Sequence, residues 1–187
     1  RTVREAIDRH NGRRPAGRRP IVQLSAAFMP EGALSNLVTD RARSDQYALA
    51  HYAQEYGRLS KWLSFVAPMA YHKDYGRPAS WVGQVVAGAA AKAGPNGSGV
   101  WAGIQTYSVT PQDVVDALGA ARLNGSSGFA LFRYATTTAQ AWDALTPTLA
   151  DVREAAAAAS EAGWIDPDLL NSFEQKLAAV EASLEAG

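Results

Sequence analysis

Four short apolar runs alternate along this chain with segments whose apolar residues recur at helical spacing. Each run ends in a polar or aromatic cluster. Strands that alternate with helices are typical of α/β proteins with a parallel sheet. Parallel sheets gather functional side chains at the carboxyl ends of their strands, so the ends of the runs are where chemistry is expected. The runs are Ile21–Phe28, Ser64–Tyr71, Val100–Tyr107 and Gly128–Tyr134.

The segments between the runs carry helix signals. Thr110, followed by Pro111 and Asp113, predicts a capped helix start, and Asn124-Gly125 predicts where that helix ends. Ser80 predicts a second N-cap. The other expected helices are Thr2–His10, Gln46–Leu63, Trp81–Lys92, a helix capped at Thr137, Asp151–Ala162 and Asp168–Leu184.

The number of units indicates how much of an architecture is present. Four βα units occupy about 140 residues, and a complete (β/α)₈ barrel averages about 250 residues. Residues 1–150 therefore have the length of half a TIM barrel, its four C-terminal βα units, and residues 151–187 form a C-terminal helical extension. A doubly wound α/β sheet is the alternative. Its usual phosphate-binding loop, G-x-G-x-x-G, does not follow the first run, and the sequence has no G-x-x-x-x-G-K-[ST].

Composition predicts a folded protein and argues against several function classes. Hydrophobic residues make up 47% of the chain and charged residues 19%, which is typical of a globular domain. Lys plus Arg equals Asp plus Glu at 18 each, so no basic field of the kind that binds nucleic acid is expected. The absence of cysteine excludes disulfides and thiolate metal sites. No apolar run reaches the roughly 18 residues of a membrane span. Because the chain begins at Arg1 within a helix-like segment, we expect a piece of a longer protein.

Aromatic side chains gather at the ends of three runs. Tyr71, Tyr107 and Tyr134 could offer ring faces to the apolar C–H patches of sugars. The alternative is that aromatic residues of the strands fill the interior of the fold. Tyr71 and Tyr107 stand at strand ends, where the binding role is more plausible than packing. This pattern favours a sugar over a phosphate or a metal.

Titratable side chains follow the second run directly. His72 could carry a proton near neutral pH, and Asp74 could act as a general acid or base. Together with Lys73 they would equally suit a solvated loop that leads into Tyr75-Gly76. No group of His, Asp and Glu has the spacing of a metal site, and no cofactor is predicted.

Three motifs in order resemble the glycosyl-hydrolase-like TIM-barrel family of bacterial glycosidases. They are the Trp-x-x-x-Val-x-Pro-Met-x-Tyr-like strand of Trp62–Tyr71, the Gly-x-Gln-x-Tyr strand of Ala102–Tyr107, and the Gly-apolar-x-x-Phe strand of Gly128–Phe132. The resemblance covers roughly residues 20 to 145. It implies that the four runs are the fifth to eighth strands of a barrel, with the first half of the barrel missing from this chain.

The resemblance also implies which residues contact substrate. Glycosidases generally use two carboxyl groups across the scissile bond, and many barrel enzymes take one of them from the seventh strand. Gln105 would stand there and cannot fill that role, which leaves Asp74 as the preferred acid or base, with Glu31 and His72 as the other catalytic candidates. The expected substrate-binding residues are Met69, Tyr71, Lys73, Gln105, Tyr107, Arg133 and Tyr134.

The function implied by the resemblance is hydrolysis of glycosidic bonds in a polysaccharide or oligosaccharide, by a secreted or cell-envelope protein. One alternative is a non-catalytic carbohydrate-binding barrel, because a seventh-strand carboxylate is lacking. Another is a doubly wound α/β domain used for assembly. A half barrel has an apolar inner face and open strand edges, so we also expect it to bind its missing half or to self-associate.

Overall fold

The computed structural model describes residues 2–13, 22–35 and 44–145, together with positions 157, 168, 171, 175 and 178. Residues 23–137 form one compact unit, and residues 2–22 with 138–187 form another. The second unit contains α1 (Thr2–Gly12) and a helix over 139–145. Of the two helices expected after residue 150, the structure describes only single helical positions, 157 in the first and 168, 171, 175 and 178 in the second; the rest of both lies outside the described residues. None of the described helices is long and apolar enough to cross a bilayer.

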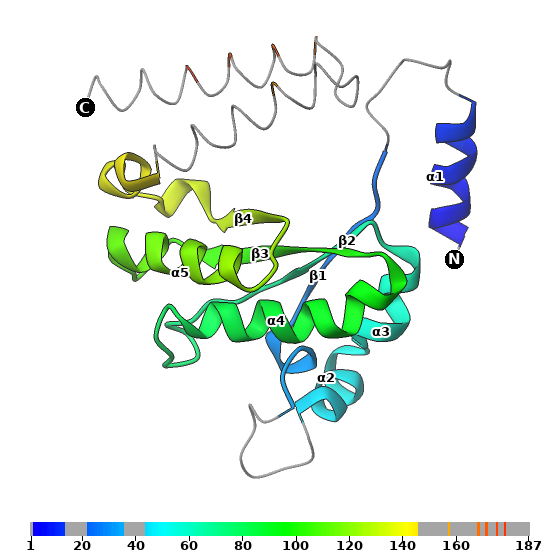
Figure 1. Cartoon of the computed structure of the whole chain (residues 1–187), viewed down its shortest axis with the longest axis horizontal. Coiled ribbons are helices and arrows are strands. Elements are labelled where there is room, and N and C mark those ends of the chain that lie inside the picture. The colour runs from blue at the N-terminus through cyan, green and yellow to red at the C-terminus, as the bar shows by residue number, and fades with distance from the viewer. Residues whose placement is uncertain are drawn as a thin grey trace. The chain divides into compact units, whose positions relative to one another are not determined.

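The four expected strands are confirmed and form one parallel sheet in the order β1-β2-β3-β4 (Figure 1). Each is shorter than its apolar run, because the run also includes the residues that leave the sheet. Phe65 of β2 pairs with Ser25 of β1 on one side and with Gly99 of β3 on the other, and Gly128 of β4 pairs with Trp101 of β3. The strands are β1 (Ser25–Phe28), β2 (Phe65–Pro68), β3 (Gly99–Gln105) and β4 (Gly128–Phe132).

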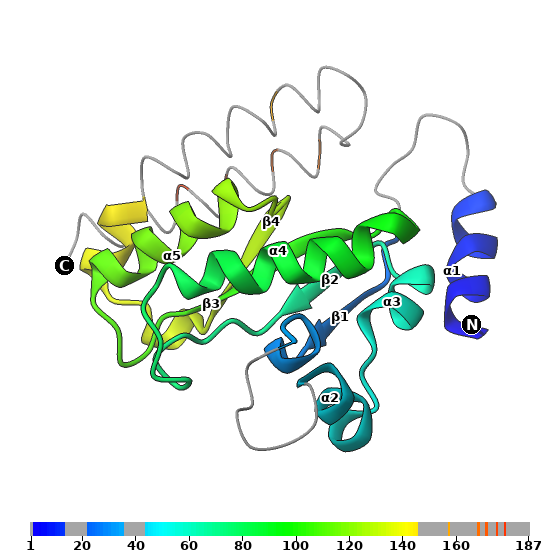
Figure 2. The same ribbon diagram turned by 60° about the horizontal axis from the view of Figure 1, so that its bottom comes forward.

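The two long connecting helices, α4 (Trp81–Ala93) and α5 (Pro111–Leu123), lie side by side on one face of this sheet (Figures 1 and 2). Right-handed crossovers that always step to the next strand in the same direction place every helix on the same face. The core lies between this helix layer and the sheet. Its buried apolar members include Val66, Val82, Val85, Val86, Ala89, Val100, Ala102, Ile104, Val114, Ala117, Leu118 and Ala121.

The opposite face of the sheet carries the alternate residues of each strand. Phe65 and Trp101 stack there, with ring centroids 4.3 Å apart and an interplanar angle of 16°. Trp101 is 36% exposed. Its indole lies so close to Gly128 that a Cβ on that glycine would come within 2.6 Å of the ring. The sheet therefore has one face covered by helices and one that presents exposed aromatic surface.

The single helix expected over Gln46–Leu63 is wrong. The structure has α2 (Ser44–Tyr52), α3 (Tyr56–Leu59) and the 3-10 turn η2 (Ser60–Trp62) instead. The break occurs at Ala53, whose φ of 52° is left-handed and ends α2. Two residues later, Glu55 is extended. The interruption turns Gln54 and Tyr56 toward the end of β1, where their side chains bind the backbone of Met29.

The predicted helix caps have mixed outcomes. Ser80 does not cap α4: it has helical φ and ψ and makes no capping hydrogen bond. The cap of the helix over 139–145 lies one residue later than expected, because Ala141 N–H donates to Thr138 Oγ1 at 3.2 Å. The capping box of α5 is confirmed, with Asp113 N–H donating to Thr110 Oγ1 and Thr110 N–H donating to Asp113 Oδ2. Asn124 ends that helix as predicted.

We predict that Thr110→Ala lowers the free energy of unfolding by about 1 kcal/mol, the usual effect of losing an N-cap hydroxyl. The variant removes the acceptor for Asp113 N–H and leaves the apolar contacts of α5 intact. Urea denaturation followed by circular dichroism measures the difference. Thr110→Ser keeps the hydroxyl and is the matched control; equal losses in both variants would show that the cap contributes nothing.

Candidate functional site

The carboxyl ends of β2 and β3 bring together three of the predicted site residues. Asp74 lies in the turn after β2, Gln105 ends β3, and Tyr107 follows two residues later. Gln105 Nε2 donates to Asp74 Oδ1 at 3.0 Å, and Tyr107 Oη donates to Asp74 Oδ2. A carboxylate has about four lone-pair sites, so each oxygen of this exposed Asp74 still has capacity to accept a hydrogen bond from a ligand.

Gln105 connects the two strand ends. Its side chain is fully buried, and its Oε1 accepts from the backbone N–H of Lys73 at 3.0 Å while its Nε2 holds Asp74. Both ends of the amide are therefore used by the turn after β2. Gln105 therefore holds in place the turn that carries Asp74.

Aromatic rings border this carboxylate. Tyr71 stacks on Phe132 with centroids 5.2 Å apart, and Tyr107 meets both rings edge-on at 6.2 Å. Burial, followed by the hydrogen bond to Asp74, raises the pKa of Tyr107 to about 12. Burial and then the Asp74 charge raise the pKa of Tyr71. Both phenols are therefore neutral donors at physiological pH, beside a carboxylate acceptor.

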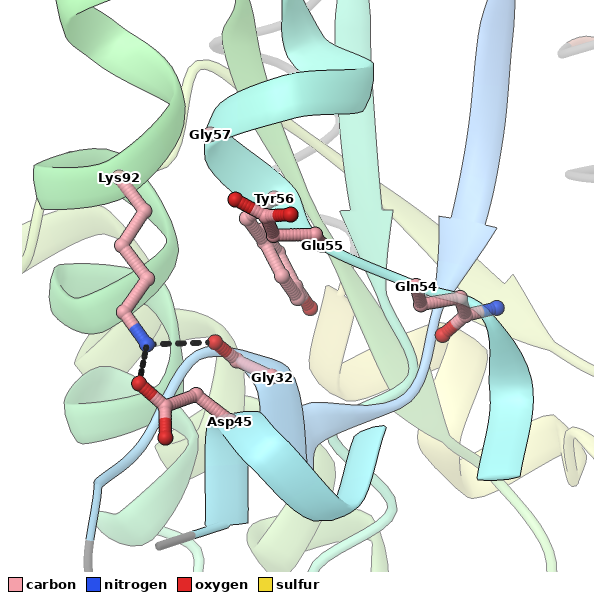
Figure 3. Close-up of a pocket in the computed structure, with 7 residues that line it drawn as sticks. All are labelled: Gly32, Asp45, Gln54, Glu55, Tyr56, Gly57 and Lys92. Carbon is pink, nitrogen blue, oxygen red and sulfur yellow. Dashed lines mark hydrogen bonds and ion pairs between the residues drawn. The ribbon is translucent and has the colours of Figure 1, made fainter. Parts of the chain in front are cut away.

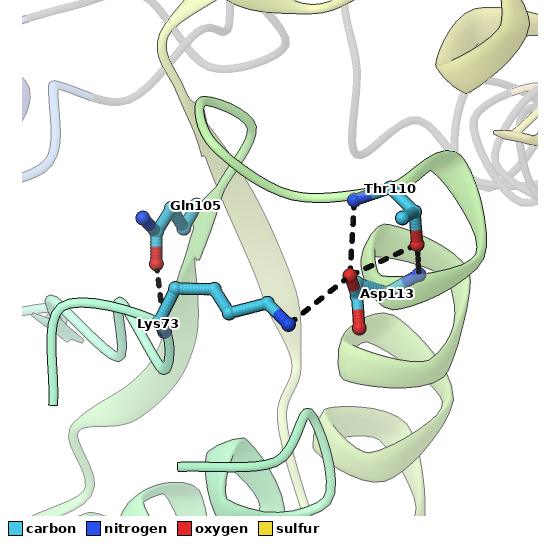
Figure 4. A network of polar contacts seen from close by, with 4 residues as sticks. All are labelled: Lys73, Gln105, Thr110 and Asp113. Carbon is cyan, nitrogen blue, oxygen red and sulfur yellow. Dashed lines mark hydrogen bonds and ion pairs between the residues drawn. The ribbon is translucent and has the colours of Figure 1, made fainter. Parts of the chain in front are cut away.

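The Lys73 side chain extends toward the start of α5. Its Nζ lies 3.6 Å from Asp113 Oδ2, the same oxygen that accepts from Thr110 (Figure 4). The hydrogen bonds from Thr110 are the main cause that lowers the pKa of Asp113. An ion pair with partly exposed partners contributes little to stability, so its effect is to orient the turn. The Lys73 side chain is 47% exposed and remains accessible to a ligand.

His72 is placed inside the protein. It is fully buried, and neither ring nitrogen has a hydrogen-bond partner among the residues that the structure describes. Burial lowers its pKa; the Lys73 charge acts in the same direction, and the carboxylates of Asp113 and Asp74 oppose it. A proton carrier must reach the group that it serves, and these nitrogens form no hydrogen bond within the described part of the chain. The geometry favours a neutral packing residue behind the turn.

We predict that His72→Leu keeps the free energy of unfolding at pH 7.5 within about 1 kcal/mol of the unmodified protein, because no hydrogen bond is lost. A folded-state pKa below the unfolded value of 6.5 means that the stabilising contribution is present above pH 6.5 and is lost as the pH falls through the folded pKa. The free energy of unfolding of His72→Leu should therefore fall less than that of the unmodified protein as the pH is lowered from 7.5 to 5. Urea titrations between pH 7.5 and 5 measure it, and a loss of several kcal/mol at pH 7.5 would contradict the packing role.

Glu31 lies after β1, in the 3-10 turn η1 (Pro30–Gly32), and is only 7% exposed. Its Oε1 accepts from Tyr75 Oη at 3.0 Å, and its Oε2 is buried with no hydrogen-bond partner among the described residues. Burial, and then the charge and hydrogen bond of Glu31, raise the pKa of Tyr75 well above its ordinary value. The Tyr75 ring also packs against Trp81 at 5.1 Å. Glu31 therefore hydrogen-bonds to Tyr75, which lies in the same turn as Asp74, and not to Asp74 itself.

The structure places the three remaining predicted residues by other contacts. Met69 directly follows β2 and forms a parallel bridge with Gly103 of β3. The carbonyl of Arg133 accepts from Thr106 Oγ1 at 2.9 Å. Tyr134 begins the 3-10 turn η4 (Tyr134–Thr136) and is 66% exposed. The structure shows neither Arg133 nor Tyr134 in contact with Asp74.

Two site residues were missed in the sequence. Phe132 ends the fourth strand, so the rule that selected Tyr71 and Tyr107 could also have selected it. Tyr75 had no signal, because its partner Glu31 is 44 positions away.

A cavity of about 240 Å³ lies beside β1, lined by Gly32, Asp45, Gln54, Glu55, Tyr56, Gly57 and Lys92 (Figure 3). Lys92 Nζ donates to Gly32 O at 2.7 Å and lies 3.9 Å from Asp45 Oδ2. These contacts tie α4 to the segment after β1. The cavity includes none of the predicted site residues, so we regard it as part of the supporting structure.

Within the described residues, no group of three or more His, Asp or Glu side chains could hold a metal ion. The cluster offers one exposed carboxylate, whose oxygens can each accept a further hydrogen bond, beside aromatic rings, a set that suits the hydroxyl groups of a neutral ligand. Comparison with protein-family models, with curated proteins and with solved structures finds no match to this chain.

Proposed function

We propose that residues 23–137 are four βα units of a (β/α) barrel, and that the cluster around Asp74 hydrolyses glycosidic bonds of a polysaccharide. The consecutive parallel strand order supports the barrel over a doubly wound sheet, since the latter reverses its order at a switch point and places helices on both faces. In a barrel the aromatic face of the sheet would be the interior. The carboxyl strand ends would be its active face.

One observation carries the proposal of a sugar site. Asp74 is exposed and held by Gln105 and Tyr107, and the Tyr107 ring meets the stacked rings of Tyr71 and Phe132. A sugar ring needs both kinds of surface, because it has hydroxyl groups on its rim and apolar C–H groups on its faces. Asp74 would transfer the proton to or from the reacting oxygen. The second carboxyl group of such a reaction would come from the other four strands of the barrel or from Glu31.

A specific observation favours binding without catalysis as the second candidate. The cluster contains a single exposed carboxylate, and the end of β3 offers the amide of Gln105 in place of another. A site with one carboxylate and several aromatic rings can hold a sugar without cleaving it. In either role the protein would act on glycans outside the cytoplasm, in a secreted or cell-envelope setting.

Incubation of the protein with a panel of neutral, amino-sugar and uronic-acid polysaccharides tests the proposal. Anion-exchange chromatography detects released oligosaccharides, and affinity electrophoresis on the same panel detects binding. Released products would support hydrolysis. Retardation without products would support the binding role. Neither effect with any glycan would contradict both.

A further inference from the structure

The outer edge of β1 is closed at its carboxyl end by side chains and open before that. Leu24 O and Phe28 O accept from Ser64 N–H and Met69 N–H of the neighbouring chain segment. Because backbone groups alternate in direction along a strand, Ser25, Ala27 and Met29 point their N–H and C=O groups toward the other, outer edge.

Gln54 and Tyr56 occupy the far end of that edge. Gln54 Oε1 accepts from Met29 N–H at 2.7 Å, and its Nε2 donates to Ala27 O at 3.4 Å. These are the two backbone groups that a further parallel strand would use opposite Phe28. Tyr56 Oη also donates to Met29 O at 3.2 Å. Figure 3 shows Gln54 beside the end of β1. The side chains thus end any strand pairing before Met29.

The groups before this point are free to pair. Ala27 N–H and both backbone groups of Ser25 have no hydrogen-bond partner in the part of the chain that the structure describes. The same holds at the other end of the sheet. Phe132 O accepts from Thr106 N–H, so the alternate residues Phe129 and Leu131 direct their backbone groups outward, where no partner is found among the described residues. The two edge strands, β1 and β4, therefore both have outward backbone N–H and C=O groups to which a further parallel strand could bond.

We propose that two copies of this chain associate by pairing β4 of each with β1 of the other, which completes an eight-stranded parallel barrel. The inference rests on the barrel arrangement proposed above. Four consecutive strands from each copy make the eight of a (β/α)₈ barrel. The exposed rings of Trp101 and Phe132 become interior, and the formal net charge of zero sets no overall repulsion between copies. The hydrogen bonds from the Gln54 and Tyr56 side chains to Ala27 and Met29 limit the pairing of β1 to residues up to Ala27.

Sedimentation velocity of the unmodified chain at tens of micromolar tests this proposal. The expected species has twice the 19.9 kDa mass of the chain. Ala27→Pro removes the outward N–H and leaves the ladder to β2 unchanged, so the expected product is a monomer. Ala27→Ser retains the N–H and should remain a dimer. A monomeric unmodified chain, an open series of larger assemblies, or a dimer unaffected by Ala27→Pro would each overturn the proposal.

Hydrogen exchange gives a readout that does not depend on the folding of a variant. The amides of Ala27, Phe129 and Leu131 should become protected as the concentration of the unmodified chain rises, whereas Met29 should be protected throughout by Gln54. Exchange that is independent of concentration at the first three would overturn the pairing. The glycan assays on the same samples keep the two proposals separate, because a monomer that binds or cleaves a polysaccharide would refute the dimer alone.

Discussion

Asp74→Asn should lower the rate of glycoside hydrolysis by about 10²–10⁴-fold, the usual contribution of general acid–base catalysis, and leave polysaccharide binding within a few fold. Asparagine has nearly the same shape. Its carbonyl can accept from Gln105 Nε2, and its amide can donate to Tyr107 Oη, because a phenol oxygen both donates and accepts. The substitution therefore removes proton transfer and keeps the geometry of the site.

Asp116→Asn is the matched control for this experiment. Asp116 is an exposed carboxylate on α5 that accepts from Gln112 one turn earlier, so its loss should not change hydrolysis. A rate that is unaffected by Asp74→Asn would assign the chemistry to another carboxyl group. Equal loss of binding and of hydrolysis would show that Asp74 mainly holds the sugar.

The phenol of Tyr107 reports on the same substitution. Its pKa of about 12 has burial as its largest cause and the hydrogen bond and charge of Asp74 as the next two. In Asp74→Asn this pKa should fall below about 12 and stay above the ordinary value of 10.0, because the ring remains buried to the same extent. Ultraviolet absorbance at high pH, with Tyr107→Phe as the blank, would show whether the contact exists in solution.

Gly103→Ala should lower the free energy of unfolding by about 1–3 kcal/mol, the usual cost of overpacking a well-packed interior. An added Cβ would lie 2.8 Å from Pro68 O and 3.2 Å from Met69 Cα, and both atoms belong to the backbone of the neighbouring strand and the residue that follows it. Backbone cannot move aside as a flexible side chain can. The strain would be placed where Gly103 bridges Met69 and accepts from Ala70 N–H, just before the turn that carries Asp74.

Gly119→Ala provides the opposite outcome for comparison. This glycine lies on the exposed side of α5, and apart from its chain neighbours and the backbone of its own helix, no atom of the described residues lies within 4 Å of the position that an added methyl group would take. Alanine should therefore stabilise the helix by about 0.5–1 kcal/mol. Urea denaturation of both variants measures the contrast. If Gly103→Ala proves as stable as the unmodified protein, β2 and β3 can separate slightly without penalty, and the close approach does not constrain the site.

The alternation of strands and helices was readable from the sequence because its signals are local. Apolar runs of strand length and the Thr110–Asp113 capping box involve residues within a few positions of one another, and the structure confirms them. The helix break at Ala53 was not readable, because alanine favours helix continuation. The left-handed φ of Ala53 occurs together with the hydrogen bonds of Gln54 and Tyr56 to the backbone of Met29. These partners are 25 and 27 positions apart in the sequence.

The sequence by itself determined which segments would follow the strands, since parallel strands end together at one edge of the sheet, although it placed the end of the fourth strand beyond Phe132. Only the tertiary structure decided what each side chain does there. It joined Asp74 to Gln105 and Tyr107, 31 and 33 positions away, placed Phe132 against Tyr71, and buried His72 beneath the turn. The physical reason is that hydrogen bonding and burial depend on neighbours brought close by the fold, whereas strand and helix patterns depend on neighbours along the chain.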